Sequence, residues 1–343
     1  MSERLTQHPV RQGHRWVTWI PGILHLVFAI VLGATAPRTW ELPESPGTPY
    51  LRLCRALPAH GGPILHLLLT LALLWGAGKL VRALLPPKSP AATGTLAQSL
   101  GSSTLFIALT PWFQELLYPN TLLPALTALT WAQLTLLHSL SPGKHPLAAL
   151  SGLLSGLTAG LSFYAGLGIV PLGIWMLTDL FRKTEQALRR IAFFTAGMVI
   201  ALLPFAREIP ERVREAPFAP EDWTQSLTPL FTAFGVGGLL LLLLGLLVGT
   251  LQKNRILLTL ILSTGLLLKA GHIAIGSPNP LQTGAILFYP GLLCAYGIFR
   301  ILKGVESGVH AVNPAKAKSI TLLMLILLLV GLKIWAAVLL RQM

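Results

Sequence analysis

Charged residues are scarce in this chain of 343 residues. Asp, Glu, Lys and Arg make up 11% of it, whereas a soluble globular protein carries about a quarter. Hydrophobic residues make up 53%, and the mean hydropathy is +0.67. A surface with so few charges cannot lie mostly in water. The composition therefore excludes soluble enzymes, secreted disulfide-linked domains, disordered regulators and ordinary DNA-binding domains, and predicts a polytopic all-α membrane protein with a single transmembrane domain over residues 1–343.

Cysteine and the common catalytic motifs are also scarce or absent. The two cysteines, Cys54 and Cys294, have neither the number nor the spacing of a disulfide framework or a metal site. The sequence has no phosphate-binding Gly-Lys-Ser/Thr loop, no His-Glu-x-x-His and no Gly-x-Ser-x-Gly. These absences disfavour ATP-driven transport, and we expect no metal, no cofactor and no nucleic acid. The excess of 26 Lys and Arg over 12 Asp and Glu is interpreted as cytoplasmic loops lying against anionic lipids.

Long hydrophobic runs dominate the sequence. A membrane-spanning helix needs about 20 mostly apolar residues, and eleven such runs can be drawn between charges, prolines and glycines. They cover residues 17–36, 63–84, 96–112, 119–140, 147–163, 166–181, 190–206, 228–250, 256–276, 281–300 and 319–340. The fifth and sixth runs are short and meet at residues 163–166, which predicts a tight hairpin or two half-spans.

The charges in the loops predict the orientation. With the N-terminus in the cytoplasm, most loop lysines and arginines are cytoplasmic and most loop acids are outside, which agrees with the positive-inside rule and places the C-terminus outside. The first run resembles a signal peptide, but it is longer than a typical signal core and Pro37 would follow the cleavage site. We therefore expect a retained helix.

Two of the predicted outer loops are long, residues 37–62 and 207–227. In the first loop, apolar residues alternate with Arg52 and Arg55 from Thr48 to Leu57, which predicts a short amphipathic helix in the headgroup plane. The second loop predicts another interfacial helix. Long loops outside the bilayer are where a membrane protein meets its ligands.

Two glutamates in the first outer loop are the leading catalytic candidates. Glu41 and Glu44 follow the first run directly, beside Arg38 and Trp40, and prolines fix the backbone around them. A carboxylate just above the bilayer can take a proton from a hydroxyl acceptor. The alternative interpretation is a solvated acidic loop balanced by its arginines.

Four further residues are candidates for substrate binding. Glu115 lies at the outer turn between the third and fourth runs and is either a second carboxylate of an outer cavity or a solvated acid. Lys269, with His272 one turn later, lies inside a hydrophobic run, where a lysine either pairs with a lipid phosphate or extends to the headgroups. Arg207, at the end of the seventh run, is either a phosphate ligand or a capping charge.

A stripe of small residues predicts close helix packing. Gly152, Gly156 and Gly160 recur every four residues, which lets two helices approach each other closely. Three histidines lie in the apolar runs: His25, His66 and His138. We interpret them as polar residues at helix contacts, with haem ligation as the alternative.

The order of these features resembles the GT-C superfamily of integral-membrane glycosyltransferases. The resemblance is carried by T-W-E-L-P-E-S, P-Y-L-R-L-C-R-A-L, T-P-W-F-Q-E-L-L-Y-P-N-T-L-L-P-A-L, the glycine-rich pair from Gly152 to Leu177, and L-F-Y-P-G-L-L-C-A-Y-G-I-F. It implies transfer of a sugar from a polyprenyl-phosphate donor to an acceptor on the outer face of a bacterial inner membrane. It also implies the following roles: Glu41 or Glu44 as the base, Arg38, Arg207 or Lys269 on the donor phosphate, and His60 and Glu115 on the acceptor side.

Two other classes of function stay open. A non-catalytic relative would be an accessory or scaffold subunit that docks membrane protein partners, since the first loop has separated glutamates where the family often has an aspartate. A lipid or solute transporter is the third reading, although most charge lies at the two faces and not at the membrane midplane.

Overall fold

Helices make up nearly all of the described chain. The structure is a computed structural model, and it describes residues 20–35, 49–58, 60–85, 91–109, 117–141, 143–181, 185–208, 223–252, 255–274, 280–312, 320 and 323–324. No β-strand occurs in these ranges. The predicted all-α fold is confirmed.

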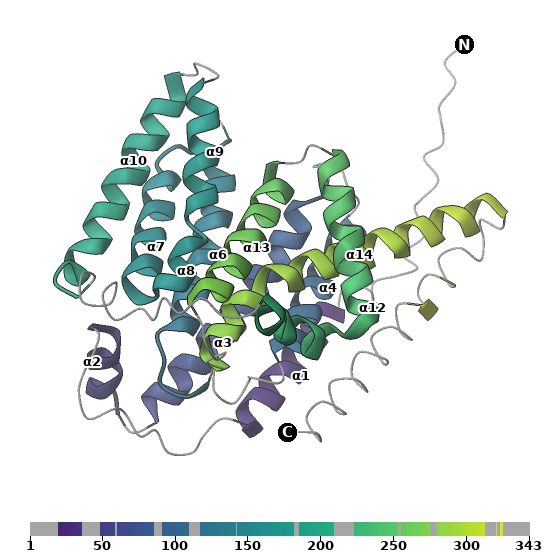
Figure 1. Cartoon of the computed structure of the whole chain (residues 1–343), viewed down its shortest axis with the longest axis horizontal. Helices are drawn as coiled ribbons and strands as arrows, with labels where there is room; N and C mark the ends of the chain where they lie inside the picture. Colours follow the sequence, from purple (N-terminus) through teal and green to yellow (C-terminus); the bar gives the residue numbers. More distant parts are fainter. Residues whose placement is uncertain are drawn as a thin grey trace, which may run out of the picture.

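The helices follow one another with short connections (Figure 1). In chain order they are α1 Ile20–Thr35, α2 Pro49–Ala56, α3 Gly61–Ala83, α4 Ala91–Leu109, α6 Leu122–Ser139, α7 Leu147–Leu161, α8 Phe163–Leu167, α9 Val170–Phe181, α10 Glu185–Leu202, the 3-10 turn Leu203–Phe205, α12 Trp223–Gln252, α13 Arg255–Ala274 and α14 Pro280–Val312. Each predicted run from 17–36 to 281–300 contains a helix, and the last run, 319–340, lies almost entirely outside the described residues.

Five of the described helical segments are long and apolar enough to cross a membrane. They are Gly61–Ala83, Phe163–Phe181, Gln186–Phe205, Leu227–Val248 and Gly284–Val312. The eleven-span topology and the sidedness of the two termini stay predictions. The predicted break between the fifth and sixth runs is present: α7 ends at Leu161, and the extended Ser162 accepts a hydrogen bond through its hydroxyl from the Ala165 amide at the start of α8.

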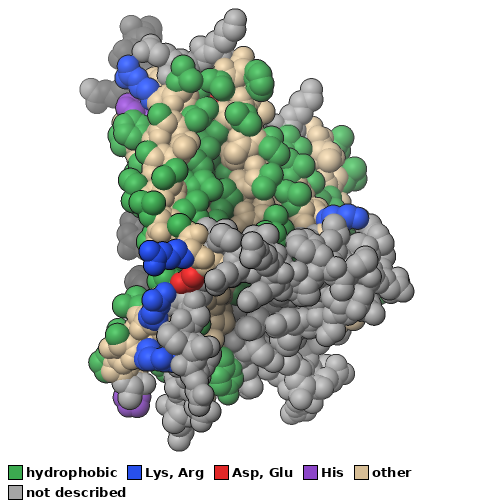
Figure 2. Space-filling model, turned by 60° about the vertical axis from the view of Figure 1, so that its left-hand side comes forward, with side chains coloured by type: hydrophobic (Ala, Val, Ile, Leu, Met, Phe, Trp, Pro, Cys, Tyr) green, Lys and Arg blue, Asp and Glu red, His purple; other side chains and the backbone are tan. Residues whose placement is uncertain are grey.

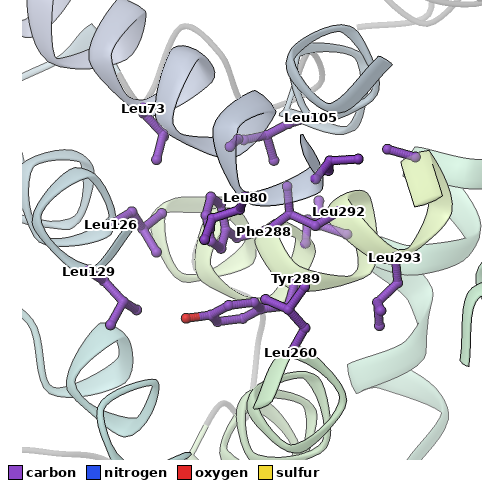
Figure 3. Close-up of a cluster of buried hydrophobic side chains, with 14 of the residues drawn as sticks. Leu73, Leu80, Leu105, Leu126, Leu129, Leu260, Phe288, Tyr289, Leu292 and Leu293 are labelled. Atoms are coloured by element: carbon purple, nitrogen blue, oxygen red, sulfur yellow. The ribbon is translucent and has the colours of Figure 1, made fainter. Parts of the chain in front are cut away.

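The second half of the chain contributes the centre of the core. In Figure 1, α14 runs across the other helices, and 89% of its most apolar stretch is buried. Phe288, Tyr289 and Leu292 project from α14 among leucines of α3, α4, α6 and α13 (Figure 3). A helix that is apolar on all sides is stable where other helices surround it, so this stretch of α14 faces protein.

Glycines bring α10 against α7 and α14 against α12. A Cβ on Gly152 would collide with the backbone carbonyl of Phe194, and one on Gly156 would lie 2.5 Å from the Met198 oxygen. The predicted small-residue interface is therefore confirmed, and its partner is α10. Gly245 and Gly297 make the equivalent contact between α12 and α14.

Hydroxyl groups join the helices inside the bundle. Ser102 of α4 donates to the Leu74 carbonyl of α3 at 2.8 Å, and Ser151 of α7 donates to the Ala132 carbonyl of α6 at 2.7 Å. Gln133 of α6 donates to the Tyr289 hydroxyl of α14 at 2.6 Å. These bonds satisfy polar groups that neither a hydrocarbon core nor an apolar interior would solvate.

A broad apolar surface covers the flank of the molecule. Figure 2 shows hydrophobic side chains along the middle of one face, with charged side chains toward its ends. Large exposed residues on α9 and α10 include Leu177, Leu188, Val199 and Ile200. A soluble protein rarely exposes so large an apolar area, so this flank requires lipid or another protein.

The glycine contact between α7 and α10 is testable by overpacking. We expect Gly156→Leu to lower the free energy of unfolding by about 1–3 kcal/mol or more, because the new side chain meets backbone that cannot yield. Thermal unfolding of the detergent-solubilised protein measures the effect. Gly173→Leu is the matched control, since a Cβ at Gly173 on α9 meets nothing within 4 Å. Equal stabilities of the two variants would contradict the close approach.

Candidate functional site

The short helix α2 lies where the first outer loop was predicted to form one. It runs from Pro49 to Ala56, inside the predicted stretch 48–57, and its two faces differ in polarity. Cys54 is buried and Tyr50 packs against the main core, whereas Arg52 and Arg55 are exposed. The predicted amphipathic helix is therefore present, with Tyr50 and Cys54 against the protein and Leu53 exposed, and its position in the headgroup plane stays a prediction.

An ion pair ties α2 to the end of α10. The Nη2 atom of Arg52 lies 3.0 Å from Oε1 of Glu208 and donates a hydrogen bond to it. The side chain of Arg52 is 58% exposed and that of Glu208 is 18% exposed. These residues belong to the two long loops predicted from the sequence, so the described parts of both loops meet on one face.

Tyr50, Cys54 and His66 form the contact beneath α2. The rings of Tyr50 and His66 lie 5.9 Å apart, with His66 fully buried at the start of α3. Burial raises the pKa of the Tyr50 hydroxyl, and the neighbouring thiol of Cys54 raises that pKa further. Burial also raises the pKa of Cys54, an effect that the Tyr50 hydroxyl opposes. Both groups are therefore neutral at neutral pH, and Cys54 is a packing residue and not a thiolate nucleophile.

The structure places three of the expected substrate-binding residues at the surface. His60 precedes α3 and Arg207 ends the α10 segment beside Glu208, so both lie near α2. Lys269 is exposed on α13, which packs against α8, α9, α12 and α14 and thus belongs to another part of the bundle. The remaining expected site residues, Arg38, Glu41, Glu44 and Glu115, lie outside the described residues, as does the side chain of His272.

Among the described residues, the face around α2 carries more basic than acidic side chains. Arg52, Arg55 and Arg207 are exposed there with Glu208, and Arg207 makes no ion pair with a described residue. Figure 2 shows basic and acidic side chains together at the lower end of the apolar face. Guanidinium groups at a bilayer surface suit a phosphate ligand, because their forked donors match phosphate oxygens.

The described residues provide no metal centre or haem pair. They contain no group of three or more His, Cys, Asp or Glu that could hold a metal ion. Of the histidines considered for haem, His66 lies at the α2 end of α3, whereas His138 is exposed at the far end of α6. These two histidines are not brought together.

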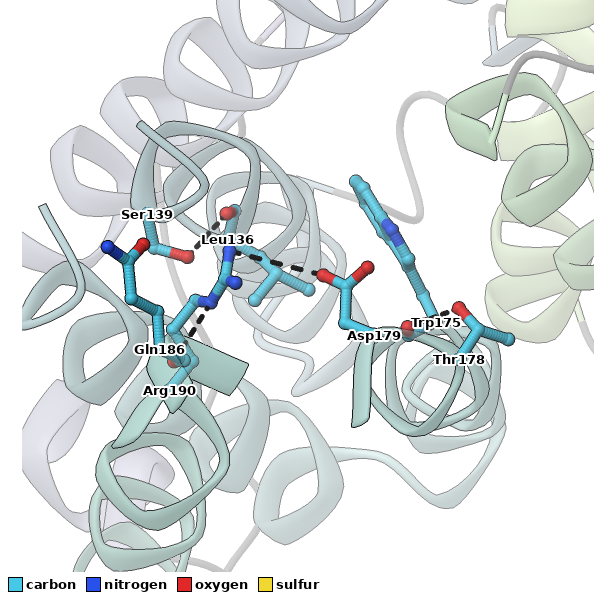
Figure 4. A network of polar contacts seen from close by, with 7 residues as sticks. All are labelled: Leu136, Ser139, Trp175, Thr178, Asp179, Gln186 and Arg190. Atoms are coloured by element: carbon cyan, nitrogen blue, oxygen red, sulfur yellow. Dashed lines mark hydrogen bonds and ion pairs between the residues drawn. The ribbon is translucent and has the colours of Figure 1, made fainter. Parts of the chain in front are cut away.

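A second charged cluster lies at the opposite end of α10 and was not foreseen. Asp179 of α9 and Arg190 of α10 lie at the ends of the predicted runs 166–181 and 190–206, and their side chains are 16% and 11% exposed (Figure 4). Hydrophobic periodicity does not distinguish a solvated charge at a helix end from one that a third helix covers. The short connection between the runs 166–181 and 190–206 does indicate that Asp179 and Arg190 lie near each other, because consecutive helices with a short connection are usually neighbours.

A scan against protein-family models finds no match for the chain, and a search of curated proteins finds none either.

The Arg52–Glu208 pair makes a testable prediction about α2. We expect Arg52→Glu to speed hydrogen exchange of the α2 amides by up to about fivefold, since an exposed pair contributes ~0.2–1 kcal/mol and the variant adds repulsion. The double variant Arg52→Glu/Glu208→Arg restores the attraction and should restore slow exchange. Hydrogen-exchange mass spectrometry measures both. Lys303→Glu, on α14, is the control; fast exchange in the double variant would argue against the contact.

Proposed function

We propose that this chain is an integral-membrane glycosyltransferase that uses a polyprenyl-phosphate sugar donor at the face formed by α2 and the end of α10. The observation that supports the proposal most is the Arg52–Glu208 contact, which joins the two long polar loops at one end of an apolar bundle. A lipid-linked donor needs this combination, because its polyprenyl chain stays in the bilayer while its phosphate and sugar reach the surface.

The proposed chemistry is a displacement at the anomeric carbon of the donor sugar. Glu41 or Glu44 takes the proton of the acceptor hydroxyl as that oxygen forms a bond to the anomeric carbon. The bond between this carbon and the phosphate oxygen breaks, and the polyprenyl phosphate leaves with the electron pair. Arg207, together with Arg38, stabilises the negative charge that develops on the leaving phosphate, whereas Lys269 lies on α13 in another part of the bundle. His60 and Glu115 are placed on the acceptor side.

A second function is favoured by one observation on α12. In its most apolar stretch 17% of the residues are buried, and Val236 is 72% exposed. A membrane protein partner that covers this face would make the chain an accessory or scaffold subunit. The two proposals differ in a single property, turnover by the isolated protein.

Carboxylate-to-amide substitutions test the enzyme proposal. Membranes that contain the protein are supplied with radiolabelled polyprenyl-phosphate sugars, and transfer of label to membrane or soluble acceptors is measured against membranes without the protein. We expect Glu41→Gln or Glu44→Gln to lower transfer by about 10²–10⁴-fold, because loss of a general base removes that much rate. Glu306→Gln, in α14 and paired with Lys303, is the control.

Two results would contradict the proposal. Unchanged transfer in the double variant Glu41→Gln/Glu44→Gln would remove the base. No transfer above background by the wild-type protein, together with a stoichiometric complex with another membrane protein, would favour the accessory subunit.

A further inference from the structure

The helix α12 is broken at Gly235. This residue has φ 58° and ψ −174°, a backbone conformation that is essentially restricted to glycine and that lies outside the α-helical range. The break divides α12 into a first part, residues 223–234, and a second part, residues 236–252. Pro229 also lies inside α12, but the non-helical angles are at Gly235. Sharp bends in helices occur where the regular backbone pattern is interrupted, so Gly235 is the place where α12 can change direction.

The second part of α12 lies against α14 and is fixed there by backbone contacts (Figure 1). A Cβ atom on Gly245 would lie 2.3 Å from the Leu293 carbonyl oxygen. A Cβ atom on Gly297 of α14 would lie 2.2 Å from the Leu241 carbonyl oxygen. Neither contact leaves room for a side chain, so the two helices cannot slide past each other without losing both contacts. The second part of α12 therefore moves with α14.

The first part of α12 packs on the core through side chains. It contains no glycine. Leu230 and Ala233 belong to the main core and are 5% and 1% exposed, whereas Phe231 is 55% exposed. Apolar side-chain contacts are non-directional and can be remade after a small displacement, unlike a contact between two backbones. The first part is therefore held less rigidly than the second.

The surface beside the break leaves room for a change of angle. Val236, the residue after the break, is 72% exposed. A Cβ atom on Gly237 would meet nothing within 4 Å. Hinges are short segments, often of small residues, that absorb a change in backbone angles while the elements on either side stay rigid. Gly235 and its two neighbours fit this description.

Movement of the first part away from the core would uncover apolar surface. Leu230 and Ala233 now cover part of the main core, and α12 packs against α4, α13 and α14. A gap opened there would be lined by apolar side chains and would face the exposed apolar side of α12. A hydrocarbon chain fits such a gap, whereas a polar headgroup or a soluble metabolite would lose its hydrogen bonds with water on entering it.

We propose that Gly235 is the hinge of a lateral gate, in which residues 223–234 swing relative to α14 and admit one hydrocarbon chain of a membrane lipid between α12 and the core. The hinge and the gate follow from the structure of α12. The further step, that the chain admitted is the polyprenyl chain of the sugar donor, rests on the proposed function.

Distances between pairs of nitroxide spin labels test the hinge in the full chain in lipid nanodiscs, with both native cysteines replaced by alanine. Labels at Phe231 and Leu247, both exposed, would lie roughly 24 Å apart along a straight helix and closer when α12 bends. We expect a broad distribution shifted to shorter distances. In Gly235→Ala it should narrow and shift toward the straight-helix value, because alanine avoids the Gly235 angles and favours helix. Labels at Leu243 and Ile301, across the fixed contact with α14, should give a narrow distribution in both proteins.

Photolabelling tests whether a lipid chain enters. The protein is reconstituted with a phosphatidylcholine that carries a diazirine on one acyl chain, and the labelled residues are mapped by mass spectrometry. We expect label on Leu230 and Ala233 as well as on the exposed Phe231. Gly235→Ala should lower the labelling of Ala233 several-fold relative to Phe231. Gly237→Ala is the matched control, since its new methyl group meets nothing, and should leave both measurements unchanged.

Three results would each overturn the gate. They are a wild-type distance distribution as narrow as that of the control pair, equal distributions in Gly235→Ala and Gly237→Ala, and labelling of Ala233 that Gly235→Ala leaves unchanged. The first needs no variant at Gly235, so it decides even where Gly235→Ala fails to fold. None of the three depends on sugar transfer. A protein that passes these tests and transfers no sugar would keep the gate and contradict the proposed function.

Discussion

The backbone contact between α7 and α10 is the constraint on which both charged ends of the molecule depend. Gly152 and Gly156 let α10 approach until its own carbonyls touch α7, and Gly197 makes the reciprocal contact from α10 toward Ala149. Packing this close fixes both the position and the register of α10. As a result Glu208 at one end reaches Arg52, and Arg190 at the other end reaches Asp179.

The length of α10 relates these two ends to a bilayer. The helix α10 from Arg190 to Leu202 and the 3-10 turn to Phe205 together span roughly 24 Å, with Arg207 just beyond, which is close to the thickness of a hydrocarbon core of about 30 Å. Exposed residues between them, such as Phe193, Val199 and Ile200, are apolar. The charged groups thus lie where the headgroups of the two leaflets would be, and the hydroxyl-to-carbonyl bonds inside the bundle satisfy polar groups that lipid would leave unpaired.

Local features of this fold could be predicted from the sequence. The stripe of Gly152, Gly156 and Gly160 indicated a close helix contact, and the alternation around Arg52 and Arg55 indicated α2, because both patterns arise within one helix. The break near Phe163 was also visible, since two short apolar runs meet there. Each of these signals depends on residues that are near one another in the chain.

Features that depend on distant residues could not be predicted in the same way. The partner of the glycine stripe is some forty residues away, and the α12–α14 contact joins Gly245 to a helix some fifty residues later, so spacing alone identifies neither. The helix α14 continues to Val312, past the predicted end of the apolar run at residue 300. The run ends where charged residues begin, but Lys303 and Glu306 pair one turn apart on the helix surface, so these charges do not interrupt the helix. Burial of Arg190 needs α6 to cover it, which the sequence of α9 and α10 does not specify. Of the expected catalytic residues, Glu41 and Glu44 lie outside the described residues and stay predictions.

The central claim is that α2 and the Asp179–Arg190 pair lie on opposite sides of a membrane. Single-cysteine labelling measures this directly, with Ala56→Cys on α2 and Ser141→Cys after α6, both at exposed positions, in a background where the buried Cys54 and Cys294 are replaced by alanine. A membrane-impermeant maleimide added to one side of sealed vesicles should label one of the two variants, and the opposite vesicle orientation should label the other. Labelling of both variants from the same side would contradict the claim.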